Sequence, residues 1–140
     1  RINEVDATDP DEAHTIRHFN ALVPEWPELS REHLHRGYWW IIYADFGFGR
    51  PVGFCGLTEF MPGVAYAKRC WIDHRHRGMG LQIRSLHTRI EKAKQLGYRQ
   101  IVSETTNIVS AGNMRKAGLE PFIPDQKWGA PDSMYFEKRL

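Results

Sequence analysis

The residues best suited to chemistry are concentrated between positions 72 and 81, where the sequence is Ile-Asp-His-Arg-His-Arg-Gly-Met-Gly-Leu. A segment with strand character, residues 65–72, ends there, and an amphipathic segment begins at about Gly78. Glycines let the main chain approach a ligand closely, and a helix N-terminus carries about half a positive charge. Two arginines and two glycines at such a junction favour an anionic ligand, and we expect a pyrophosphate to bind here.

The composition is that of an ordinary globular domain, with 140 residues, 41% hydrophobic and 26% charged. We therefore predict a single domain over residues 1–140. The net charge of +2 is too small to favour nucleic acid as a partner. No apolar run approaches the roughly 18 residues of a membrane span, and no signal peptide is evident. Cys55 and Cys70 lie inside expected strands, so we expect buried thiols in a reducing, cytoplasmic compartment.

The first half of the chain contains the signals for two helices and four strands. Strand patterns occupy residues 2–5, 38–44, 52–60 and 64–73, and glycine-containing turns are expected at 45–50 and 61–63. Asp9-Pro10 marks the start of a helix that should end at about Leu22, and Ser30 starts a shorter one to His35. The last three strands should form an antiparallel trio.

The second half begins with a helix of about 18 residues that Gly97 should end. Its apolar residues follow helical spacing: Met79, Ile83, Leu86, Ile90 and Ala93. A strand at 100–106, a helix from Asn107 to Gly118, and closing strands at 119–123 and 133–140 should follow. The long helix thus connects two parallel strands in an otherwise antiparallel sheet.

Two motifs in this order resemble those of the GNAT superfamily of acyl-CoA-dependent N-acetyltransferases. The family's Arg/Gln-x-x-Gly-x-Gly/Ala pattern stands as Arg75-His-Arg-Gly-Met-Gly80, and residues 107–119 look like its second cofactor segment. The resemblance covers about residues 52–123, and the first fifty residues match only in type. A dinucleotide-binding fold would instead open with its glycine loop, and a P-loop would need Lys-Ser or Lys-Thr where Leu81-Gln82 stands.

The resemblance implies an α+β fold with a mixed, mostly antiparallel sheet of six to seven strands. About four helices should flank this sheet, and its fourth and fifth strands should splay apart. It also implies acetyl-CoA as co-substrate, with no metal. Amides of the loop would hold its pyrophosphate, while either of two arginines would add a charge-assisted contact. The residues so implicated are Arg75, Arg77, Gly78, Met79 and Gly80, with Asn107, Ser110 and Asn113 in the second segment.

The end of the fourth strand has a separate role in the family, where its main chain pairs with the pantetheine arm. By position, Ile72 and His74 would supply those groups, and an amide near Ile72 would polarise the thioester carbonyl.

The acceptor must be a neutral amine, so a general base should lie near the splay. Glu104 is the first candidate, and Glu59 and Asp73 are the alternatives. Many family members have a tyrosine four residues before the glycine equivalent to Gly118, and this tyrosine protonates the departing thiolate. In this sequence the corresponding residue is Met114. The thiolate would then leave without a dedicated acid, with Tyr135 as a distant substitute.

The remaining residues leave several hypotheses open. Neither His14 with His18 nor His74 with His76 has a third ligand at metal-binding spacing. Trp26 is the best candidate for contact with the acceptor, a small-molecule or peptide amine.

A CoA-binding sensor that has lost catalysis is the alternative function, and a nucleic-acid-binding domain is the third. The family's C-terminal strands often build dimers, so a homodimer is one expected state.

Overall fold

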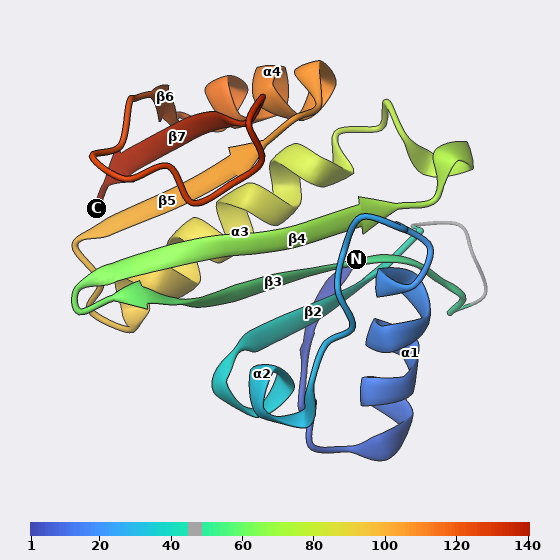
Figure 1. Ribbon diagram of the computed structural model, residues 1–140. Coiled ribbons are helices and arrows are strands. Elements are labelled where there is room, and N and C mark those ends of the chain that lie inside the picture. The colour runs from blue at the N-terminus through green and yellow to red at the C-terminus, as the bar shows by residue number, and fades with distance from the viewer. Residues whose placement is uncertain (45–48) are drawn as a thin grey trace. The chain divides into compact units, whose positions relative to one another are not determined.

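The computed structural model describes residues 1–44 and 49–140, so most of the turn expected at 45–50 lies outside the described residues. Within them, seven strands pair in the order β1-β2-β3-β4-β5-β7-β6 (Figure 1). The strands are β1 (Ile2–Val5), β2 (Tyr38–Tyr43), β3 (Pro51–Met61), β4 (Val64–Ile72), β5 (Gln100–Thr105), β6 (Glu120–Pro121) and β7 (Met134–Arg139). The α-helices are α1 (Pro10–Asn20), α2 (Arg31–Arg36), α3 (Leu81–Gln95) and α4 (Ile108–Lys116), with a 3-10 turn η1 (His74–His76).

This architecture confirms the expected α+β fold and its mixed sheet. The chain divides into two compact units, residues 1–58 with 68–81 and residues 59–67 with 82–140. The expectation of a single domain stays a prediction. No helix among the described residues combines the length and the apolar character that crossing a membrane requires.

In the first unit, aromatic residues of β2 and β3 form the base of a core that α1 and α2 cover. The ring of Phe54 stacks on Trp39 and on Phe19, with 6.3 Å between centroids in each pair. Ile16 and Leu34 bring the two helices into the same core. Gly56 lies beneath Trp39, because a Cβ at this position would stand 2.5 Å from the indole. The opposite face of these strands packs a second cluster, which contains Ile42, Val52, Ile72 and Leu81.

Both helices of the first unit begin at the caps that the sequence predicts. The Asp9 carboxylate accepts hydrogen bonds from the amides of Asp11 and Glu12, and the Ser30 hydroxyl accepts one from His33. The α1 helix ends at Asn20, two residues before the expected end.

The second unit contains the parallel pair of strands on which the crossover prediction rests. Residues 64–66 of β4 pair in parallel with residues 100–102 of β5. The next carbonyl, that of Ala67, accepts a hydrogen bond from the buried Ser103 hydroxyl at 2.9 Å. A side chain therefore takes over from the backbone ladder here, so the carbonyl is not left unpaired.

The closing strands differ in length from the prediction. The β6 strand spans two residues rather than 119–123, and it ends at Pro121, which has no N–H to donate to a ladder. The Phe122 amide still donates to the Tyr135 carbonyl of β7 at 3.0 Å. The chain then leaves the sheet, and Figure 1 shows the following segment passing across β5 before β7 begins. The last strand inserts between β5 and β6 rather than at the edge.

The α3 helix begins at Leu81, three residues after the predicted start, and spans 15 residues. Gly78 and Gly80 have φ angles of +80° and +76°, which a right-handed helix does not allow. Met79 is therefore outside the helix and 63% exposed, and Leu81 is buried in its place. Arg89, which falls between the apolar positions of this helix, is 2% exposed, and its Nε donates to the Ser85 carbonyl at 3.2 Å.

Replacing Gly112 in α4 by alanine should stabilise the protein by about 1 kcal/mol, because alanine loses less backbone entropy in a helix. No atom outside the local backbone lies within 4 Å of the added Cβ, and this glycine is not in the left-handed region. Urea unfolding would measure the gain. Gly118→Ala is the matched control and should destabilise, because φ is +97° there.

Candidate functional site

The end of β4 presents the main chain of Ile72 away from β3. The Asp73 amide donates to the Val52 carbonyl on β3 at 2.7 Å. Since neighbouring residues of a strand direct their backbone groups to opposite edges, the amide and carbonyl of Ile72 point to the other edge. The Ile72 carbonyl is not open there, because it accepts a hydrogen bond from Nε of Arg77 at 2.7 Å.

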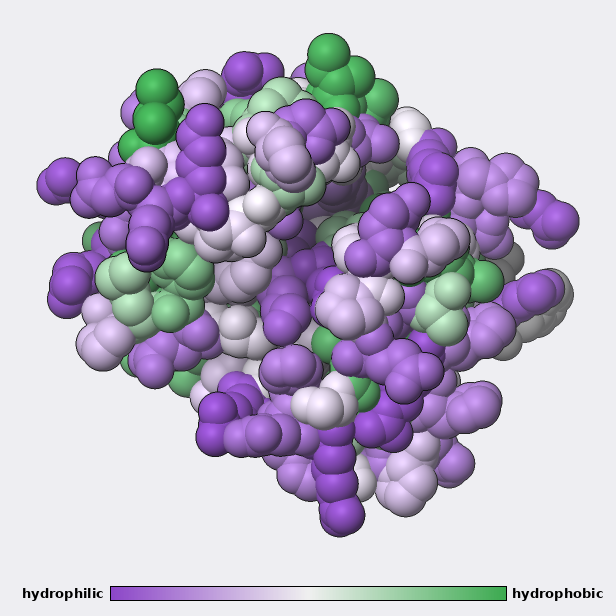
Figure 2. Space-filling view, viewed as in Figure 1, coloured by the Kyte–Doolittle hydropathy of each residue, from purple (hydrophilic) through white to green (hydrophobic). Residues whose placement is uncertain are grey.

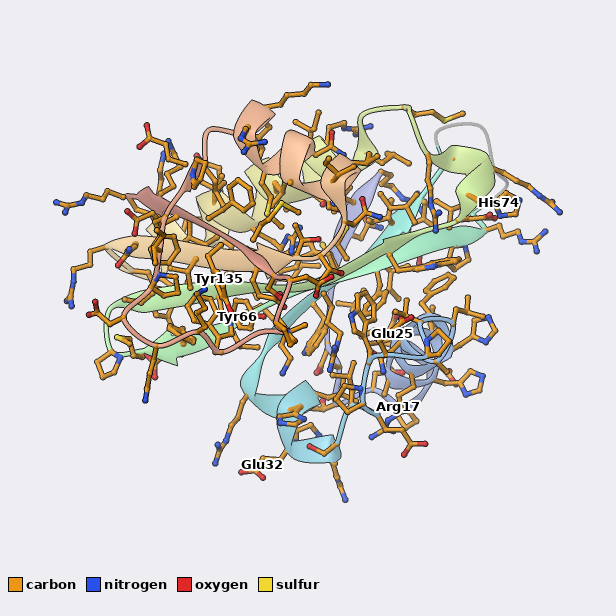
Figure 3. The ribbon with its side chains drawn as sticks, turned by 45° about the horizontal axis from the view of Figure 1, so that its top comes forward. Arg17, Glu25, Glu32, Tyr66, His74 and Tyr135 are labelled. Atoms are coloured by element: carbon orange, nitrogen blue, oxygen red, sulfur yellow. The ribbon has the colours of Figure 1, made fainter. Side chains whose placement is uncertain are left out.

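Asp73 organises the turn that follows the strand, where η1 carries His74 (labelled in Figure 3). Its carboxylate accepts a hydrogen bond from the Arg75 amide at 3.2 Å. That bond, with smaller contributions from the nearby His74, Arg75 and His76 charges, lowers the pKa of Asp73 below its ordinary value. The Asp73 carboxylate thus caps the turn. This role differs from that of the general base, for which Asp73 was an alternative candidate.

The two arginines of the predicted loop differ in what they contact. Arg77 is tied to its own loop, with its guanidinium 5.9 Å from the ring centre of Trp71 and its amide 3.4 Å from the His74 carbonyl. Arg75 is exposed. Of the two, Arg75 is the better placed for a charge-assisted contact with an anion, and Arg77 is better described as a brace between the loop and β4.

The two glycines give the loop its left-handed turns, and the space next to them is open. A Cβ at Gly78 or Gly80 would meet no heavy atom within 4 Å. Glycine is needed at these positions for backbone conformation rather than for close packing. The Met79 and Gly80 residues lead directly into the first turn of α3, whose amides have no intrahelical acceptor.

In the second unit, the other predicted cofactor residues form a polar network on α4. The Asn107 side chain caps the helix by accepting hydrogen bonds from the amides of Val109 and Ser110. Gln82 of α3 donates to the Ser110 hydroxyl at 3.1 Å and accepts from the Asn113 amide at 2.7 Å. The structure therefore links Ser110 and Asn113 through Gln82. In the sequence alone, this glutamine served only to exclude a P-loop.

Glu104 is held by two hydroxyl groups in the second unit. Its Oε2 accepts a hydrogen bond from Ser133 at 2.6 Å, and its Oε1 accepts one from Tyr66 at 3.5 Å. The Glu104 residue is half-buried. The alternative base Glu59 is exposed and accepts from the Tyr98 hydroxyl at 3.4 Å. Glu104 thus has the more defined position of the two.

Tyr135, named as a distant substitute for the missing acid, lies directly opposite Glu104 in the β5–β7 register. Its ring is 5% exposed, and its hydroxyl accepts a hydrogen bond from the Gly129 amide at 2.9 Å. Figure 3 shows Tyr135 and Tyr66 on the same side of the strands. Met114, at the family's tyrosine position, is buried. The sequence could not show that a β7 tyrosine faces the candidate base, because register follows from strand order.

Trp26, the predicted acceptor contact, is half-buried and belongs to the edge of the first unit's core. It meets Phe54 edge to face, and the Arg69 guanidinium lies 5.1 Å from its ring centre. Arg69 also donates to the Pro27 carbonyl at 3.4 Å. Its φ of +60° within β4 is strained for a residue with a side chain, and these contacts hold it there. A role for Trp26 in binding the acceptor stays a prediction.

One open hollow of about 370 Å³ lies in the first unit, between the end of β1, α2 and the start of β2. Asp6 and His35 are among its lining residues, and no predicted site residue is. Neither the glycine loop nor Glu104 therefore contributes to this hollow.

Within residues 1–44 and 49–140, no three His, Cys, Asp or Glu side chains gather closely enough to hold a metal ion.

Comparison with known proteins decides the family. A family model described as the acetyltransferase (GNAT) family matches residues 3–118, which is most of the chain. The chain belongs to the GNAT acetyltransferase family. The match includes both motifs that carried the resemblance, together with the first helices, which matched only in type. A comparison with curated proteins found no match.

Solved structures share the GNAT fold over the full length of this chain. A candidate acyl-CoA N-acyltransferase from Klebsiella pneumoniae subsp. pneumoniae is 23% identical, with a TM-score of 0.78 and 97% of its chain covered. A GNAT acetyltransferase from Elizabethkingia anophelis with acetyl-CoA bound is 15% identical, at 0.76 and 97%. A Bacillus subtilis acetyltransferase in complex with CoA is 18% identical, at 0.72 and 98%.

The pKa of Asp73 predicts how the η1 turn responds to acid. The stability that this carboxylate contributes should be present above the unfolded-state pKa and lost as the pH falls through the lowered folded-state pKa. A carboxyl carbon-13 NMR titration should place its midpoint below that of aspartate in a model peptide. Asp73→Asn is the control, since it keeps an acceptor oxygen without titrating, and a midpoint at or above the model-peptide value would contradict the prediction.

Proposed function

We propose that this GNAT protein transfers an acetyl group from acetyl-CoA to a primary amine by direct attack within a ternary complex. The observation that carries the proposal is the loop before α3, in which two left-handed glycines lead into the first helical turn. Such a turn offers several amides to one anion, and the helix dipole favours negative charge there. Two structures of the same fold contain CoA or acetyl-CoA, which supports this donor.

On the donor side, the amides of Gly78, Met79 and Gly80 would bind the pyrophosphate, and exposed Arg75 would add a charged contact. Arg77 would act indirectly, because its side chain bonds the end of β4 to the loop. Ser110 and Asn113, already bridged by Gln82, would form a polar contact surface for CoA, while Asn107 would hold α4 in place as its cap.

The main chain at the end of β4 would pair with the pantetheine arm. The Ile72 amide points away from β3 and would polarise the thioester carbonyl as it becomes tetrahedral. His74 lies in η1 rather than in the strand, so its main chain would meet CoA from within a turn.

On the acceptor side, Glu104 would take a proton from the ammonium form of the acceptor, directly or through a water. The neutral amine nitrogen then attacks the thioester carbon and the C–N bond forms. As the C–S bond breaks, the second proton leaves the nitrogen for water or for the departing thiolate. A thiol with an ordinary pKa of about 8.5 leaves tolerably well as an anion, so a dedicated acid is not essential. The acceptor is a small-molecule or peptide amine, and its identity is a matter for a substrate screen.

A CoA-binding sensor without catalysis is the second candidate, and the buried Met114 favours it. This residue stands where many family members have the tyrosine that protonates the leaving thiolate, and its side chain cannot do so. Thiol release from acetyl-CoA with a panel of polyamines, lysine peptides and arylalkylamines separates the two functions. Binding of acetyl-CoA without thiol release from any acceptor would select the sensor.

The Gly80→Ala substitution should weaken acetyl-CoA binding at least about tenfold, because alanine at φ +76° shifts the loop amides. Isothermal titration calorimetry measures the dissociation constant. Gly112→Ala is the matched control, as a glycine-to-alanine change inside α4, and should bind as the wild type does. Wild-type protein that fails to bind at millimolar acetyl-CoA would refute the donor assignment altogether.

The Glu104→Gln substitution should lower kcat by about 100-fold or more while leaving acetyl-CoA affinity unchanged, since the amide cannot accept the proton. It keeps the size of the side chain, so the change in folding should be small. Glu59→Gln is the control that tests the alternative base. A reversed result, with Glu59→Gln inactive and Glu104→Gln active, would transfer the base role to β3.

A further inference from the structure

We propose that Ser133 is a positioning residue for Glu104, which fixes the carboxylate so that Oε1 is the oxygen that receives the proton. This inference rests on the proposed role of Glu104 as general base. It concerns the segment between β6 and β7, to which neither the sequence motifs nor the family model assigns a role, because the family match ends at residue 118.

The Ser133 hydroxyl is oriented by its own partner. Its Oγ accepts a hydrogen bond from the Ala130 amide at 2.9 Å, so its proton is directed elsewhere. The acceptor is Oε2 of Glu104, at 2.6 Å. A short bond between a hydroxyl and a carboxylate is among the stronger hydrogen bonds in proteins. The chain Ala130 amide, Ser133 hydroxyl, Glu104 carboxylate therefore has one consistent direction.

The surroundings of the two carboxylate oxygens are unequal. A Cβ added to Gly129 would lie 2.8 Å from Oε2 of Glu104 and 2.5 Å from the Ser133 Oγ, so main chain covers this side of the carboxylate. Within residues 1–44 and 49–140, the partner of Oε1 is the Tyr66 hydroxyl, at the longer distance of 3.5 Å. The proton from the amine or its water would pass to Oε1, while Ser133 keeps its own proton on Oγ.

Aromatic packing fixes the segment that carries Ser133. The Trp128 ring lies 4.6 Å from the ring centres of Phe60 and of Tyr135. The Gly129 amide donates to the Tyr135 hydroxyl at 2.9 Å, so the next residue is anchored as well. A segment pinned at two successive residues presents the Ser133 hydroxyl with little freedom, which is what holding a base in one rotamer requires.

The test compares Ser133→Ala and Gly129→Ala with the wild type. The first removes the hydroxyl. The second keeps every functional group but adds a Cβ 2.5 Å from the Ser133 Oγ and 2.8 Å from Oε2 of Glu104, so the contact between them must change. Each should lower kcat by about tenfold while leaving the dissociation constant of acetyl-CoA unchanged, because a base that samples several rotamers meets the amine in the productive geometry less often. The carboxyl carbon-13 NMR signal of Glu104 should broaden or divide in each variant, a readout that needs no turnover.

Two controls separate positioning from general structural damage. Ser133→Thr keeps the hydroxyl and should restore the wild-type kcat and the wild-type carboxyl signal of Glu104. Thr88→Val deletes a hydroxyl that donates to the Arg84 carbonyl within α3, and should leave both readouts unchanged. The thermal unfolding midpoint of each variant shows whether it is folded at the assay temperature.

The outcomes distinguish the positioning role of Ser133 from the base role of Glu104. If Glu104→Gln is inactive but Ser133→Ala keeps the wild-type kcat and the wild-type Glu104 carboxyl signal, the positioning role is wrong and the base assignment stands. If Glu104→Gln is as active as the wild type, the base assignment fails and the positioning role fails with it. If no acceptor gives thiol release, a broadened or divided Glu104 carboxyl signal in Ser133→Ala still supports the contact, and an unchanged signal refutes it.

Discussion

The parallel pairing of β4 with β5 is the constraint on which the rest of this fold depends. Two consecutive parallel strands cannot be joined by a hairpin, so the chain must return through a crossover, and α3 is that crossover. The glycine loop is the point where the chain turns from β4 into the helix. Its position follows from strand polarity, and its φ angles then decide where α3 begins.

Side-chain hydrogen bonds connect separate elements at several points of the second unit. Ser103 satisfies the Ala67 carbonyl beyond the last ladder pair, and Gln82 links α3 to two residues of α4. Ser133 bonds to the Glu104 carboxylate. These polar side chains are thus positioned by specific hydrogen bonds. On the face seen in Figure 2, hydrophobic residues lie in separate groups on a largely hydrophilic surface.

Local signals explain which predictions were confirmed. The caps at Asp9, Ser30 and Asn107 are short-range hydrogen bonds, and each helix begins beside its cap. The apolar spacing wrongly places Met79 inside the helix, because the pattern extends to positions before Leu81, where α3 begins. The left-handed conformation of Gly78 and Gly80 excludes these positions from the helix. The burial of Arg89 could not be predicted, because a buried cation that bonds to its own helix has no signature in hydropathy.

The sequence by itself determined the element order, the crossover, the glycine loop and the membership of the GNAT family that the loop indicated. These follow from residues close in the chain, whose conformational preferences act over a few positions. Only the tertiary structure decided that Arg77 braces Ile72, that Tyr135 faces Glu104 and that Ser133 bonds to it. Those contacts depend on strand register and on the path of the β6–β7 segment, which are settled when distant parts of the chain pack together.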